Sequence, residues 1–99
     1  MEIKEIRDGD KLTIVLEGRL DTASSAATES DVQGRLDGVN HLTLDLEALE
    51  YVSSAGLRAV LSLEKAMDTK GGDMIITHVR EEVLEIFEIT GFTDILKIV

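Results

Sequence analysis

Two stretches of the chain alternate apolar and polar residues, which is the two-residue period of a strand with one buried face. A third stretch, at residues 73–79, is a continuous apolar run, which is typical of a strand covered on both faces. Asp8-Gly9-Asp10 separates the first two strands, and it favours a hairpin because Gly adopts the positive φ that a tight turn requires. The predicted strands are residues 2–7, 11–17, 41–46 and 73–79, with Leu12, Ile14, Leu16, Leu42, Leu44 and Leu46 facing inward.

Between the later strands, apolar residues recur every three or four positions, which is the period of a helix. The strongest helical pattern ends at Gly71-Gly72 and the last one at Gly91, while the first is weaker because its middle is polar and contains Gly34. A glycine after an apolar last turn predicts a left-handed end at Gly91, with Phe92 packed back on Phe87. The predicted helices are residues 22–37, 54–69 and 80–90.

Strands that alternate with helices are typically joined by right-handed crossovers into a partly parallel sheet. The sequence therefore predicts one α/β domain over residues 1–99, with a mixed sheet of four to five strands packed with helices and a short tail at 92–99. In such sheets, ligands and partners usually meet the loops at the carboxyl ends of the strands. Those loops are expected at residues 20–22, 47–54 and 79–81.

The composition narrows the classes of function. Ten Lys and Arg residues against twenty Asp and Glu residues give a formal net charge of −10, and the cations are scattered along the chain. Nucleic acid and anionic membranes are therefore not expected as direct ligands, since phosphate binding depends on clustered cations. The acidity either keeps the protein in solution or attracts a basic partner. The absence of Cys excludes disulfides and cysteine-based zinc sites.

No apolar stretch stands near Met1, and the longest apolar runs are only a few residues. We expect neither a signal peptide nor membrane insertion, and we expect a cytoplasmic protein that is a monomer or weak dimer.

Two adjacent serines stand where the strongest predicted helix begins. The unpaired N–H groups and the dipole at a helix N-terminus favour an oxygen acceptor or a negative charge. A role as N-cap, worth about 1 kcal/mol of stability, explains the presence of one serine, Ser53 or Ser54, but not of both. No Glu or Gln stands three residues after either serine, so a capping box is absent. Gly56 in the first turn leaves its backbone open, so we expect another element to lie against it.

Three segments, Leu16-Glu-Gly-Arg-Leu-Asp21, Leu42-Thr-Leu-Asp-Leu46 and Tyr51-Val-Ser-Ser-Ala-Gly-Leu-Arg58, resemble bacterial anti-sigma factor antagonists, which are STAS domains. The resemblance covers about residues 2–98. It implies a protein without a cofactor that binds an anti-sigma factor, itself a serine kinase, and so frees the sigma factor. Phosphorylation by that kinase would block the antagonist, and a serine phosphatase would restore it.

The resemblance also implies site residues. Ser54 is the expected phosphoacceptor and Ser53 a minor candidate. Many members have Asp-Ser-Ser/Thr-Gly-Leu in this segment, so Ser53 stands where they have Asp, and Ala55 stands where they have a second hydroxyl. The expected partner-binding residues are Asp21, Thr22, Ser53, Ser54, Ala55, Gly56, Leu57 and Arg58.

Other functions fit the sequence less well. An accessory STAS subunit of a lipid-transporting ATPase would use the same surface without phosphorylation, and a small-molecule or nucleotide sensor lacks a Gly-rich phosphate loop and aromatic residues. An enzyme is not expected, because no GxSxG elbow or base accompanies the serines. Asp45 lacks the other residues of a receiver phosphorylation site, and no residues are expected to converge on His41 or His78, so no metal site is expected.

Overall fold

A tight hairpin opens the chain and starts the sheet. β1 (Glu2–Asp8) runs antiparallel to β2 (Lys11–Leu20), with Asp8 paired to Lys11. Gly9 has a φ of 61° in the two-residue turn between them. This confirms the predicted hairpin, because a glycine at the first central position is what a type II′ turn requires.

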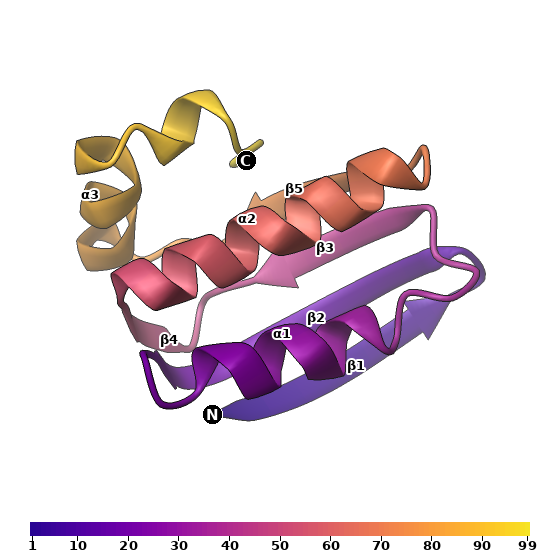
Figure 1. The fold of residues 1–99 in the computed structure, drawn as a ribbon, viewed down its shortest axis with the longest axis horizontal. Helices are drawn as coiled ribbons and strands as arrows, with labels where there is room; N and C mark the ends of the chain where they lie inside the picture. The colour runs from indigo at the N-terminus through magenta and orange to yellow at the C-terminus, as the bar shows by residue number, and fades with distance from the viewer.

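The computed structural model describes all of residues 1–99 (Figure 1). Four strands lie in the order β1-β2-β3-β5, and β4 pairs with the carboxyl end of β2. All pairs except β1–β2 are parallel, so the sheet is mixed and has five strands, as expected. The elements are β1 (Glu2–Asp8), β2 (Lys11–Leu20), α1 (Ser25–Gln33), β3 (His41–Asp45), β4 (Leu49–Val52), α2 (Ser54–Thr69), β5 (Asp73–Thr77), α3 (Glu81–Ile89) and the 3₁₀ turn η1 (Phe92–Asp94).

The core lies between one face of the sheet and the helices. Figure 1 shows α1 and α2 side by side on this face, with α3 at the end of the sheet. The side chains predicted to face inward on β2 and β3 are all buried, and they form one cluster with apolar residues of all three helices. The alternating pattern is confirmed: Leu12, Ile14, Leu16, Leu42, Leu44 and Leu46 are at most 1% exposed.

The opposite face of the sheet has no helix on it, and this corrects the expectation for residues 73–79. Met74 and Ile76 are buried under the helices, but Ile75 on the other face is only half-buried. The strand also ends at Thr77, because His78 adopts a left-handed φ of 57° that a strand cannot continue.

The first helix is shorter than the predicted range of 22–37. The Asp21 carboxylate accepts hydrogen bonds from the backbone N–H groups of Ala23 and Ser24, both at 3.1 Å, and these bonds fold the segment before Ser25 into a turn. α1 ends at Gln33, followed by Gly34 and a second turn. Short polar side chains that bond the nearby backbone compete with helix in this way.

The last helix ends as predicted, at a left-handed glycine. Gly91 has a φ of 79°, and Phe92 is half-buried against the core that contains Phe87. The tail then returns to the sheet, where Ile98 forms a parallel bridge with Ile76 at the outer edge of β5.

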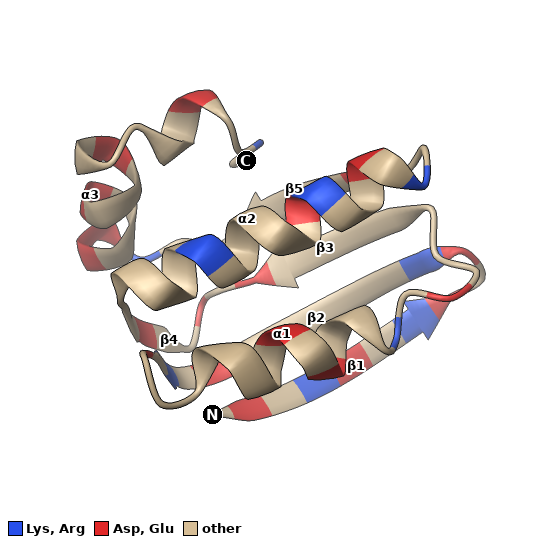
Figure 2. Cartoon of the chain, in the orientation of Figure 1, with Lys and Arg blue, Asp and Glu red and all other residues tan.

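None of the helices has the length and apolar character needed to span a membrane. Figure 2 shows Lys and Arg on β1, β2 and α2 and in the connecting segments, interspersed with Asp and Glu.

Candidate functional site

A short strand that the sequence pattern did not predict positions the two serines. β4 lies within the expected loop 47–54 and pairs in parallel with the last residues of β2. Its two end residues, Leu49 and Val52, are buried, and the two between them are exposed. Four residues with this pattern do not alternate, so periodicity alone could not indicate a strand.

The parallel pairing of β2 and β4 brings two loops together. Leu20 pairs with Val52 at the ends of the strands, and the Ser53 backbone N–H donates to the Leu20 carbonyl oxygen at 2.9 Å. The next residues, Asp21 and Ser54, therefore leave the sheet at the same edge. This places the Asp21–Thr22 loop beside the serine motif, as the resemblance implied.

The two serines have different environments. Ser53 is the N-cap of α2, with extended backbone (φ −92°, ψ 176°), and its hydroxyl oxygen accepts the Gly56 backbone N–H at 3.1 Å. Ser54 is the first residue of the helix, is exposed, and forms no side-chain hydrogen bond within the chain. Its hydroxyl therefore faces solvent at the positive end of the helix dipole.

Gly56 is packed too closely for any side chain. A Cβ atom at this position would lie 2.5 Å from the Leu20 carbonyl oxygen and 2.8 Å from a methyl carbon of Val52. This confirms that another element lies against the glycine. The first turn of α2 is thereby held directly on the ends of β2 and β4.

The remaining motif residues divide by exposure. Thr22 and Arg58 are exposed and Ala55 is half-buried, whereas Gly56 is buried and Leu57 is only 4% exposed. Gly56 and Leu57 therefore support the surface from beneath and do not offer side chains to a partner. Arg58 lies one helical turn after Ser54.

The Asp21 carboxylate is hydrogen-bonded within its own loop. Hydrogen bonds from Ser24, its backbone N–H foremost, and from the Ala23 N–H stabilise the carboxylate and lower the pKa of Asp21, against the opposing effect of burial. The ionised side chain thus fixes the shape of the loop that lies beside the serines.

An exposed arginine–tyrosine pair lies next to this loop and was not predicted. Arg19 and Tyr51 are register partners on β2 and β4, and the Arg19 guanidinium carbon lies 4.4 Å from the centre of the Tyr51 ring. Tyr51 is 37% exposed. Arg and Tyr are enriched among the residues that contribute most to protein interfaces.

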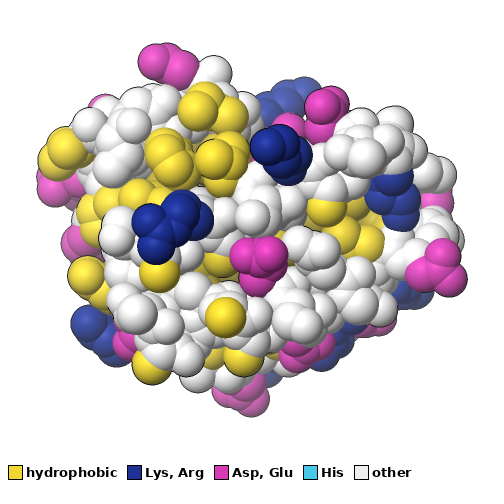
Figure 3. All heavy atoms as spheres, viewed as in Figure 1, with side chains coloured by type: hydrophobic (Ala, Val, Ile, Leu, Met, Phe, Trp, Pro, Cys, Tyr) yellow, Lys and Arg dark blue, Asp and Glu magenta, His cyan; other side chains and the backbone are white.

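A groove of about 530 Å³ extends from Arg58 along α2 to the C-terminal segment. Figure 3 shows apolar side chains gathered on this face, over α2 and the C-terminal segment. One carboxylate oxygen of Glu64 is buried there without a hydrogen-bond partner. Burial, together with the charges of Asp68 and Asp73, raises the pKa of Glu64. The groove is lined by Arg58, Leu61, Ser62, Glu64, Lys65, Asp68 and Ile95.

Both histidines have acidic neighbours, so the expectation that no residues converge on them is wrong. His41 Nδ1 lies 2.7 Å from a carboxylate oxygen of Asp73, and His78 Nδ1 lies 3.3 Å from one of Asp45. The parallel pairing of β3 with β5 causes both contacts, because it aligns residues far apart in the sequence.

Comparison with known proteins finds one matching domain model and several related sequences. The sequence model of the STAS domain matches residues 2–99. The BtrV protein of Bordetella bronchiseptica is 34% identical over 88 residues, which are 88% of this chain and 76% of that protein. The anti-sigma-B factor antagonist of Listeria monocytogenes is 30% identical over 100 residues, covering 99% of this chain and 86% of that protein.

A solved structure of the phosphorylated form of Bacillus SpoIIAA has the same fold. It superposes with a TM-score of 0.75 over 99% of this chain and 91% of its own, at 16% identity. The chain therefore shares its mixed sheet and helices with SpoIIAA.

Proposed function

The chain belongs to the STAS domain family, and from this we propose that it is an anti-sigma factor antagonist switched by phosphorylation of Ser54. It acts in the cytoplasm by binding a partner rather than by catalysis. The partner is an anti-sigma factor that is also a serine kinase, and binding it frees the sigma factor. The kinase phosphorylates Ser54 and so ends the interaction, and a serine phosphatase reverses the change.

The observation that carries the proposal is that the two serines differ in hydrogen bonding and exposure. Ser53 is engaged in capping α2, whereas Ser54 is exposed and has no hydrogen-bond partner in the chain. A kinase can reach the Ser54 hydroxyl without opening the helix. The Ser53 hydroxyl would first have to give up its bond to Gly56.

The position also explains how phosphorylation spares the fold. A phosphate adds a charge of about −1.5 to −2, and the N-terminus of α2 favours negative charge. Ser54 is exposed and its side chain makes no hydrogen bond in the chain, so no rearrangement is needed to accommodate the group. The stability of the folded chain should therefore change little.

A partner that covers Ser54 would be strongly affected. The phosphate would have to be desolvated in the interface next to the Asp21 carboxylate, which stays ionised in its loop. A loss of about 2–4 kcal/mol corresponds to about 30- to 1,000-fold weaker binding. The proposed partner surface consists of Asp21, Thr22, Ser53, Ser54, Ala55 and Arg58, with Arg19 and Tyr51 beside it.

The decisive experiment combines phosphosite mapping with binding. The protein is incubated with ATP and the anti-sigma factor kinase encoded in the same genome, and the modified residue is identified by mass spectrometry. Calorimetric titration then compares both forms of the protein. We expect phosphate on Ser54, binding weakened by at least about 30-fold, and an unchanged melting temperature.

Two variants provide the controls. Ser54→Ala should bind the kinase and resist inactivation, and Ser53→Ala should still be phosphorylated and released. Phosphate found only on Ser53 would contradict the assignment of Ser54. Normal kinase binding without phosphorylation of either serine would contradict the switch and favour an accessory transport subunit instead.

A further inference from the structure

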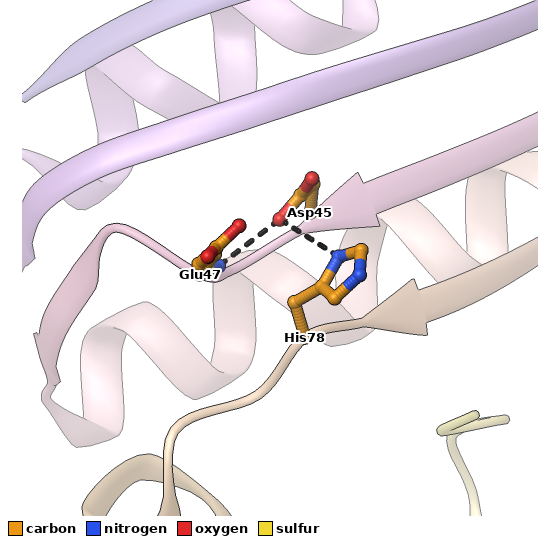
Figure 4. Close-up of side chains that lie close together, drawn as sticks. All are labelled: Asp45, Glu47 and His78. Carbon is orange, nitrogen blue, oxygen red and sulfur yellow. Dashed lines mark hydrogen bonds and ion pairs between the residues drawn. The ribbon is translucent and has the colours of Figure 1, made fainter.

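Three side chains that can bind a metal ion meet at the carboxyl ends of β3 and β5. Asp45 is the last residue of β3, Glu47 follows two residues later, and His78 follows the last residue of β5. Asp45 pairs in register with Thr77, so the parallel arrangement of the two strands places the three residues together. Figure 4 shows the Asp45 carboxylate between the other two side chains.

The geometry of the cluster resembles part of a coordination shell. One ligand atom from each residue lies within 4.8 Å of those of the other two. The Asp45 Oδ1 and His78 Nδ1 atoms are 3.3 Å apart. Two ligands at about 2.0–2.1 Å from a tetrahedral zinc ion are separated by roughly 3.3 Å, so this pair already has the spacing required. The carboxylate of the exposed Glu47 lies within 4.8 Å of both of these residues' ligand atoms.

Two hydrogen bonds to the backbone of Glu47 hold the loop in place. Asp45 Oδ1 accepts the Glu47 backbone N–H at 3.0 Å, and the Arg80 Nε donates to the Glu47 carbonyl oxygen at 2.7 Å. Metal-binding carboxylates are commonly oriented by such bonds. The Asp45 side chain is 22% exposed and that of His78 is 63% exposed, so the site is open to an entering ion and to water ligands.

We propose that Asp45, Glu47 and His78 bind a divalent transition metal ion, with zinc as the best fit. An imidazole nitrogen with two carboxylate oxygens suits zinc, cobalt or nickel, whereas calcium and magnesium prefer oxygen ligands alone. The ion also neutralises two neighbouring carboxylates in a chain with a net charge of −10. Bound there, it links the β3–β4 loop to the loop after β5.

The other histidine provides a matched control. His41 also lies between two carboxylates, but Asp73 is 2.7 Å from its Nδ1 and Asp10 is 3.9 Å from its Nε2. Because the two nitrogens point in different directions, one ion cannot take a carboxylate ligand on both sides of the ring. His41 therefore has the same residue types around it without the same convergence.

The test uses the whole chain, freed of metal with EDTA and titrated with Zn²⁺ by calorimetry. The visible absorption of added Co²⁺ reports the coordination geometry. We expect one ion per chain, a Co²⁺ spectrum of nitrogen and oxygen ligands, and a higher melting temperature with Zn²⁺. His78→Asn should weaken binding by about 10-fold or more, and His41→Asn should not.

Asn is chosen because it tolerates the left-handed backbone of His78, so the variant should fold. Glu47→Gln, in an exposed turn, is a second variant that should also weaken binding. No uptake of Zn²⁺ or Co²⁺ would overturn the proposal. So would equal loss in the His41 and His78 variants, or binding that neither His78→Asn nor Glu47→Gln affects.

Discussion

The Ser53 hydroxyl accepts a hydrogen bond from the Gly56 backbone N–H, and the atoms are 3.1 Å apart. This bond satisfies one of the four N–H groups that the start of α2 leaves without a partner. It also separates the two serines, because the one that caps the helix is not the one that faces solvent. The effects of substituting them should differ accordingly.

Ser53→Ala should destabilise the protein by about 1 kcal/mol, because it removes the N-cap. Ser54→Ala should change the free energy of unfolding by less than about 0.5 kcal/mol, since the exposed hydroxyl has no partner in the chain. Urea unfolding followed by circular dichroism would measure both values. Equal losses in the two variants would contradict the assignment of the cap.

Gly56→Ala should destabilise the protein by about 1–3 kcal/mol, because the added methyl group would meet the Leu20 carbonyl oxygen at 2.5 Å. Gly34→Ala is the matched control. There the nearest atom would be 3.5 Å away and φ is −66°, so Ala should be neutral or stabilise by about 0.4–1 kcal/mol. Thermal melts of both variants test this, and a Gly56→Ala protein as stable as the parent would refute the close packing.

Asp21→Asn should reduce stability at neutral pH but not in acid. The folded chain lowers the pKa of Asp21, mainly through the Ser24 N–H, so the stabilisation is present above the unfolded pKa of about 3.9. It is lost as the pH falls through the lower, folded pKa. Unfolding curves between neutral and acidic pH should therefore converge for parent and variant. Asp37→Asn, in an exposed turn, is the control for removing a carboxylate charge.

Glu64→Gln should raise stability at neutral pH. Burial raises the pKa of Glu64 in the folded chain, so folding disfavours the charged form and stability falls as the pH rises through the interval between the two pKa values. The advantage of Gln should shrink below the unfolded pKa of about 4.3. Glu85→Gln, at an exposed position of α3, is the control, and a pH-independent effect at Glu64 would contradict this account.

Regular patterns allowed much of the fold to be predicted from the sequence. Alternation located β2 and β3 because one face of each strand is buried and the other is not. The separate rule that a continuous apolar run marks a strand covered on both faces failed for β5, where an apolar residue, Ile75, lies on the open face. Hydrophobicity alone did not distinguish a half-buried position from a covered one.

Features that depend on contacts between distant residues could not be predicted. β4 exists because it pairs with the end of β2, and its own four residues carry no period. The contact of His78 with Asp45 depends on the register of β3 and β5, which the sequence pattern does not specify. The start of α2 at Ser54 was predicted, because helix starts have a local signal in the sequence.

The two outer edges of the sheet differ in a way that bears on self-association. An unpaired edge strand is a template on which another chain can add a strand. β1 carries charged residues at five of its seven positions, which disfavours such pairing. On the opposite side, Ile76 of β5 donates its N–H to the Lys97 carbonyl oxygen and accepts the Val99 N–H, both at 2.9 Å. The chain's own tail thus occupies bonding positions on β5, where Asp73 is the one charged residue, and the folded protein should resist aggregation through strand addition.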